Sequence, residues 1–235
     1  MNSANNSPKN TKEDKFCPFF LDFVKLTGAP PALIWKKPRI CYVGDKKKCR
    51  AKGGLLIASN HVSFTDPVML YCVFWYRRMR IWATKELFEN PFIAFLFRRM
   101  GIIEIDRENF NMTTLHNSID LLKKGSALLV FPEGHVTQDG ETASFKSGVV
   151  LMSQLSGAPI QPVYMVRPQK WYQRHVAVVG EPINVRGMCS RFPSVEELQK
   201  VTEYIREREL DLEQYYHTHV LGKSHVKEEE TPCQS

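Results

Sequence analysis

Short apolar runs alternate with longer amphipathic stretches from Arg39 onward, and this alternation predicts strands alternating with helices. We expect strands at 39–43, 55–59, 80–83, 102–105, 127–131, 160–165 and 176–179. We expect helices at 67–76, 91–99, 112–124, 145–155 and 195–216. Because helices fall between successive strands, the predicted fold class is α/β: a single domain with a mixed, mostly parallel sheet flanked by helices.

The same pattern predicts the organisation of the whole chain. Residues 1–15 are polar and predict a disordered lead-in, residues 39–220 form the folded domain, and residues 221–235 form a charged tail. The chain has 235 residues, of which 43% are hydrophobic, and this suits one domain with appendages. No apolar run approaches the roughly 18 residues of a transmembrane helix, and the N-terminus lacks the apolar centre of a signal peptide.

Residues 16–38 allow two interpretations. They contain four phenylalanines, and Trp35 precedes Lys36 and Lys37, which is typical of a membrane-contact segment. A short N-terminal helix packed on the core would have the same composition. In either case Gly28 and the pair Pro30–Pro31 are expected to break any helix.

Charge and cysteine content narrow the possible partners. The formal net charge is +7, with basic clusters at 36–39, 46–48, 77–80 and 98–99. Such charge suits an anionic membrane surface, phosphorylated substrates or nucleic acid, but no nucleic-acid-reading motif accompanies it, so we expect a membrane surface and no nucleic acid. The 6 cysteines include no CxxC pair, which favours reduced thiols in a cytoplasmic protein.

The loop that follows the strand at 55–59 carries the first candidate chemistry. His61 and Asp66 lie five residues apart, just before the helix that begins near Pro67. A histidine is the usual general base near neutral pH, and a carboxylate on its far nitrogen fixes the tautomer. Asp66 could instead be a helix N-cap, and His61 an ordinary loop histidine.

Polar residues also follow two further strands. Arg107 follows the strand at 102–105, and Glu133 follows the strand at 127–131. The carboxyl ends of parallel strands share one edge, so His61, Asp66, Arg107 and Glu133 are expected to converge on one crevice. Arg107 and Glu133 could instead belong to ordinary surface turns. No G-x-S-x-G nucleophile elbow is present, which favours direct transfer to a hydroxyl over a covalent intermediate.

Four ordered blocks give the chain a resemblance to the glycerolipid acyltransferases, and most closely to the 1-acylglycerol-3-phosphate acyltransferases. They are NHVSFTD at 60–66, GIIEIDR at 101–107, FPEG at 131–134 and APIQPV at 158–163. Lys85 also matches a lysine common between the first two blocks. The resemblance spans roughly residues 36 to 185 and is specific because the blocks keep both their order and their spacing.

The resemblance implies that His61 is the general base and that Asp66 orients it. It implies that Arg107 and Lys85 hold the acceptor's phosphate, while Glu133 and Gly134 line the acceptor pocket. The implied reaction moves an acyl group from acyl-CoA or acyl carrier protein to a lysophospholipid hydroxyl, with no metal or organic cofactor. Such substrates imply peripheral association with the cytoplasmic membrane.

Two departures from the family pattern keep the acceptor open. Glu104 replaces a phenylalanine in the second block, and His135-Val136-Thr137 follows FPEG where the family usually has Thr-Arg-Ser. Both departures reduce positive charge where a phosphate is expected. The alternatives are another lysophospholipid, glycerol 3-phosphate or an ornithine-type lipid as acceptor. A non-catalytic lipid-binding protein would be expected to lose His61 or Asp66, and a hydrolase to have a nucleophile elbow.

Overall fold

A computed structural model describes residues 16–36, 38–106, 112–132, 148–166, 168, 173–190 and 193–221. The described chain forms one α/β domain with a seven-stranded sheet. The strands are β1 (Arg39–Tyr42), β2 (Leu55–Ser59), β3 (Met79–Thr84), β4 (Ile102–Ile105), β5 (Ala127–Val130), β6 (Ile160–Val166) and β7 (Val176–Val179). The helices are α1 (Pro18–Lys36), α2 (Lys46–Cys49), α3 (Asp66–Val73), α4 (Pro91–Met100), α5 (Met112–Lys123), α6 (Gly148–Ser156) and α7 (Val195–Tyr215). A 3₁₀ turn, η1 (Lys85–Phe88), and a π turn, η2 (Tyr216–Leu221), complete it.

The sheet has the strand order β1-β7-β6-β2-β5-β3-β4, with β2 at its centre. All neighbouring strands are parallel except β6 and β7, which are antiparallel. The predicted mixed, mostly parallel sheet is therefore confirmed. Because β2, β3, β4 and β5 run in one direction, the loops that follow them leave from the same edge.

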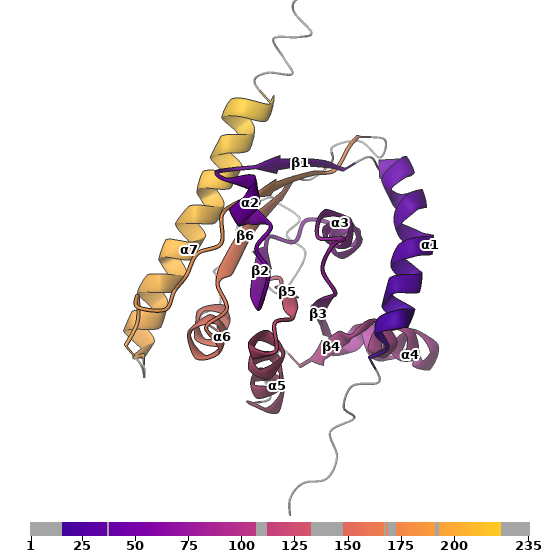
Figure 1. Cartoon of the computed structure of the whole chain (residues 1–235), viewed down its shortest axis with the longest axis horizontal. Coiled ribbons are helices and arrows are strands. Elements are labelled where there is room, and N and C mark those ends of the chain that lie inside the picture. The colour runs from indigo at the N-terminus through magenta and orange to yellow at the C-terminus, as the bar shows by residue number, and fades with distance from the viewer. Residues whose placement is uncertain are drawn as a thin grey trace, which may run out of the picture.

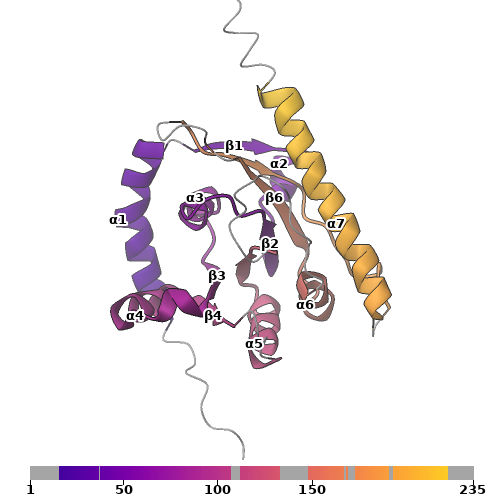
Figure 2. The same cartoon turned by 180° about the vertical axis from the view of Figure 1, so that it is seen from behind.

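Helices cover both faces of the sheet (Figures 1 and 2). Successive residues of a strand point to opposite faces, so Ile57 of β2 packs in one cluster with α3, while Leu56 and Ala58 pack in another with α5 and α6. Helices α1, α3 and α4 lie on the first side, and α5, α6 and α7 lie on the second (Figure 1). Every residue of β2 is buried, which makes this strand a rigid base for the loop that follows it.

Helix α1 corrects one expectation, because it runs through Gly28, Pro30 and Pro31 without a break. A proline removes the hydrogen bond to the carbonyl four residues earlier, here at Leu26 and Thr27. Both of these residues are exposed, so water can bind the released carbonyls. None of the described helices is long and apolar enough to cross a bilayer.

One side of α1 is held to the domain. Leu21 is completely buried, and Arg78 donates to the Asp22 carboxylate at 2.7 Å. Lys25 donates to the backbone carbonyl of Arg77. Hydrogen bonding by Arg78 lowers the pKa of Asp22, and burial lowers the pKa of Lys25. The interpretation of residues 16–38 as a helix packed on the core is therefore correct for this side.

The arginines at 77–80 contact other parts of the domain, and Arg78 is also exposed to solvent. Arg80 is 4% exposed, with its guanidinium 3.7 Å from the centre of the Phe16 ring. Arg77 donates to the carbonyl of Ala51 at 2.6 Å, and Arg78 is paired with Asp22. These side chains join separate segments, and Arg80 is shielded from solvent while Arg78 remains more than half exposed.

Candidate active site

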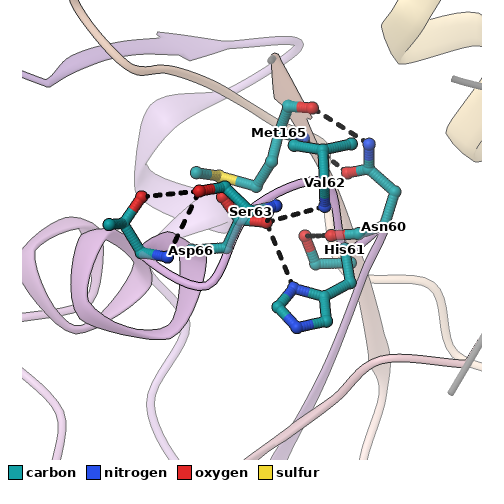
Figure 3. Close-up of polar contacts among 8 residues, drawn as sticks. Asn60, His61, Val62, Ser63, Asp66 and Met165 are labelled. Carbon is teal, nitrogen blue, oxygen red and sulfur yellow. Dashed lines mark hydrogen bonds and ion pairs between the residues drawn. The ribbon is translucent and has the colours of Figure 1, made fainter. Parts of the chain in front are cut away.

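The loop between β2 and α3 is organised around one carboxylate oxygen of Asp66 (Figure 3). Oδ2 accepts hydrogen bonds from the backbone N–H groups of Val62 and Ser63, both at 2.7 Å. The Asp66 side chain is fully buried and lies in the first turn of α3, where a negative charge is stabilised by the helix dipole. The N-cap of α3 is Thr65, so the interpretation of Asp66 as the N-cap is wrong.

His61 meets the same oxygen. Its Nδ1 lies 3.2 Å from Asp66 Oδ2, and its side chain is 15% exposed. This contact makes Nδ1 the protonated nitrogen and places Nε2 on the side of the ring away from the carboxylate. The contact expected between these two side chains is present.

Phe131 supports the imidazole from the neighbouring strand. Its ring stacks on His61 with 4.2 Å between centroids and 24° between planes. Phe131 follows β5, which pairs with β2 in parallel, so the ends of these two strands meet as expected. The sequence singled out Phe131 only as part of a motif, and no periodic pattern identifies such a contact.

Asn60 fixes the start of the loop, a role that was not predicted from the sequence. Its side-chain amide donates to the carbonyl of Met165 at 2.9 Å and accepts from the N–H of Met165 at 2.6 Å. Asn60 is 4% exposed, so these bonds are shielded from water. The position of Asn60 could have indicated such a role, because a polar amide at the end of a buried strand needs hydrogen-bond partners.

The ends of β3 and β4 bring Lys85 and Glu104 into ion pairs. Lys85 donates to the carboxylate of Asp106 at 3.0 Å, and Arg98 of α4 donates to Glu104 at 3.1 Å. The carboxylate of Glu104 is therefore neutralised locally. Asp106 is the last described residue before Arg107 in the sequence. Arg107, Glu133 and Gly134 lie outside the described residues.

Comparison with known proteins decides the family. The model of the Acyltransferase family matches residues 40–166, a range that holds the His61–Asp66 loop, the whole of β2 to β6 and all of β1 except Arg39. The chain belongs to the Acyltransferase family.

Curated relatives of this acyltransferase agree with that assignment. A 1-acyl-sn-glycerol-3-phosphate acyltransferase of Bacillus subtilis is 28% identical over 176 residues, which is 73% of this chain and 87% of the relative. A protein of the same name from Borreliella burgdorferi is 23% identical over 66% of this chain and 63% of its own length. The lysophospholipid acyltransferase LPEAT2 of Arabidopsis thaliana is 30% identical over 52% of this chain, but only 22% of its length is covered.

A solved structure supports the fold of the acyltransferase. The 1-acyl-sn-glycerophosphate acyltransferase PlsC of Thermotoga maritima superposes with a TM-score of 0.59 at 23% identity. The match covers 83% of this chain and 78% of that one. At this identity the similarity establishes a shared fold, while substrate and mechanism must be argued from the residues of this chain.

Proposed function

We propose that this acyltransferase moves a fatty acyl group from an acyl thioester to the hydroxyl of a lysophospholipid. The observation that carries the proposal is the buried Asp66 carboxylate 3.2 Å from Nδ1 of His61, at the carboxyl end of the central strand β2. A base oriented in this way suits proton removal from an attacking hydroxyl.

The proposed reaction has two steps. In the first, Nε2 of His61 takes the hydroxyl proton while the oxygen attacks the thioester carbonyl carbon and a C–O bond forms. In the second, the tetrahedral intermediate collapses, the C–S bond breaks and the imidazolium returns its proton to the leaving sulfur. Asp66 stabilises the imidazolium between the two steps. Acyl-CoA or acyl carrier protein supplies the acyl group as co-substrate, and the residues proposed here use no metal or organic cofactor.

For the acceptor, we propose 1-acylglycerol-3-phosphate, which would make phosphatidic acid the product. The names of the Bacillus and Borreliella relatives support this acceptor. Lys85 and Arg107 would hold its phosphate, and Glu133 and Gly134 would line its pocket. The pairing of Glu104 with Arg98 supports the same acceptor, because a paired carboxylate repels a phosphate less strongly than a free one.

Another lysophospholipid is the second candidate acceptor. His135-Val136-Thr137 stands where the family usually has Thr-Arg-Ser, so this chain lacks an arginine there. The missing arginine favours this second acceptor, since fewer cations suit a headgroup with less negative charge. The name of the LPEAT2 relative is compatible with it.

We further propose peripheral contact with an anionic membrane surface through α1. Phe19, Phe23 and Leu26 are 82%, 60% and 76% exposed and recur at helical spacing, opposite the buried Leu21. An exposed aromatic stripe on a surface helix is typical of interfacial binding. The side chains of Trp35 and Lys36, and Lys37 as a whole, lie outside the described residues, so their proposed contact rests on the sequence.

The test uses purified protein with acyl-CoA or acyl carrier protein and a panel of lysolipids, glycerol 3-phosphate and an ornithine lipid, read by mass spectrometry. We expect transfer to 1-acylglycerol-3-phosphate, and a loss of roughly 100- to 10,000-fold in kcat for His61→Ala with the circular dichroism spectrum unchanged. His116→Ala is the matched control, because His116 is an exposed helical histidine bonded only to the Met112 carbonyl among the described contacts. Wild-type turnover by His61→Ala would contradict the mechanism, and product from another acceptor alone would correct the substrate.

A further inference from the structure

The side chain of Asn60 takes the place of a backbone group in the sheet. Strands β2 and β6 pair in register up to Ser59 and Val163. The N–H of Leu56 donates to the carbonyl of Pro159, so continuation of this parallel ladder would join the Met165 N–H to the backbone carbonyl of Asn60 and the Met165 carbonyl to the N–H of Val62. Instead, the amide of Asn60 makes both hydrogen bonds to the backbone of Met165 (Figure 3). The last pair of hydrogen bonds in the ladder is therefore present, but the side chain of Asn60 makes it.

This substitution releases the backbone carbonyl of Asn60 and the N–H of Val62 from the sheet. The chain can then turn at once, so that the N–H of Val62 binds Asp66 Oδ2 instead of β6 and the N–H of Ser63 binds the same oxygen. Without the amide of Asn60, the buried N–H and carbonyl of Met165 would need another partner. Continued strand pairing by the Asn60 carbonyl and the Val62 N–H is the nearest replacement, and it would take the Val62 N–H from Asp66 Oδ2 and draw the imidazole of the intervening His61 away.

We propose that Asn60 is a positioning residue, which holds His61 in its catalytic orientation because its side chain completes the β2–β6 ladder and leaves the Val62 N–H free to bind Asp66. The inference rests on the proposed role of His61 as general base. Asparagine suits the task because its amide carries one donor group and one acceptor, as a peptide group does. Aspartate lacks the donor, alanine lacks both groups, and glutamine is longer by one methylene group.

The experiment compares Asn60→Asp and Asn60→Ala with Asn90→Ala. Asn90 is a matched control, because its side chain also binds two backbone groups, the N–H groups of Phe92 and Ile93 at 3.0 and 3.3 Å, but it caps α4. We expect both Asn60 variants to lose roughly 10- to 100-fold in kcat per folded molecule, since a small misplacement of a reacting group has an effect of that size. The acceptor KM should change little, and Asn90→Ala should keep the wild-type kcat. Wild-type kcat in folded Asn60→Ala would overturn the proposal.

A second measurement reports the tautomer of the His61 imidazole directly. Long-range ¹H–¹⁵N NMR spectra should show His61 protonated at Nδ1 in the wild type and in Asn90→Ala, and as a mixture of tautomers in Asn60→Asp. An unchanged His61 signal in that variant would overturn the positioning role. If the wild type transferred no acyl group, the proposed function would fail, whereas this signature would be unaffected.

A third measurement uses the wild type alone, so that it holds even if the Asn60 variants do not fold. The Met165 amide should exchange with deuterium as slowly as the Val163 amide of the same strand. Exchange as fast as that of an exposed loop amide would overturn the pairing.

Discussion

Asp66 does two things with one oxygen. Oδ2 accepts from the backbone of Val62 and Ser63 and also faces Nδ1 of His61, while Oδ1 is buried with no hydrogen-bond partner among the described residues. The shape of the loop and the orientation of the histidine therefore depend on the same atom. A single substitution at Asp66 tests both at once.

We expect Asp66→Asn to lower kcat by roughly 100- to 10,000-fold, because a neutral amide stabilises the imidazolium poorly and can present an N–H to Nδ1. Asp45→Asn is the control, since Asp45 also accepts from a backbone N–H, that of Lys47 at 2.8 Å, at the start of α2. Its kcat should match the wild type. A rate for Asp66→Asn within about threefold of the wild type would contradict the orienting role.

Arg107→Lys tests the acceptor contact predicted from the sequence. An ammonium cannot reproduce the planar bidentate contact of a guanidinium with a phosphate, so the acceptor KM should rise while the donor KM changes little. Steady-state kinetics with each substrate varied in turn measure both constants. Equal changes in the two constants, or none, would favour a structural arginine in a turn.

The pairing of His61 with Asp66 was predictable because both residues lie in one short loop. The contacts of Asn60 and Phe131 were not, because their partners lie far away in the sequence: Met165 is 105 residues from Asn60. Residue types in a local window indicate which groups need partners, but the tertiary fold decides which partners they meet.

At the scale of elements, two local rules failed to predict the helices: proline did not end a helix whose carbonyls are exposed to solvent, and helical periodicity did not reveal a very short helix. Pro30 and Pro31 do not end α1, because the carbonyls that they leave without donors lie at exposed positions. Helix α2 was not predicted, since its four residues are too short to show a helical period. Its N-cap, Asp45, was the remaining local signal.

Substitutions in α1 distinguish the contributions of its buried and exposed sides to the stability of the domain. Leu21 is fully buried, so Leu21→Ala should lower the free energy of unfolding by about 2–5 kcal/mol, as buried leucines generally do. Phe19 is 82% exposed, so Phe19→Ala should change it by no more than about 0.5 kcal/mol. Urea denaturation followed by circular dichroism measures both. Equal effects of the two variants would contradict the docking of α1 described here.

At the scale of the whole molecule, the alternation of strands and helices predicted the parallel part of the sheet. The antiparallel pairing of β6 with β7 follows from a shorter connection, since only residues 167–175 join them. A parallel connection needs about a dozen residues or more, usually with a helix. The order of the strands depends on packing across the whole sheet, and no local pattern in the sequence encodes it.

The last prediction concerns the orientation of the molecule on a membrane. If the exposed stripe of α1 enters the bilayer interface, Phe19→Ser with Phe23→Ser should reduce flotation with anionic vesicles several-fold, because each phenylalanine loses a favourable apolar burial. The net charge of +7 should make binding salt-sensitive, but only in part, since apolar contacts are not screened.

The control for this experiment is the double variant Met188→Ser with Val195→Ser. These apolar side chains are 45% and 65% exposed and lie just before and at the start of α7, which covers the opposite side of the sheet from α1 (Figure 2). A general loss of surface hydrophobicity would weaken both double variants alike, whereas a specific contact through α1 weakens only the first. Equal flotation of the α1 variant and the wild type, with both proteins folded, would exclude α1 as the membrane contact. Because Leu21, Asp22 and Lys25 hold α1 from its other side, its outer stripe can be altered without releasing the helix, and the experiment therefore separates membrane binding from folding.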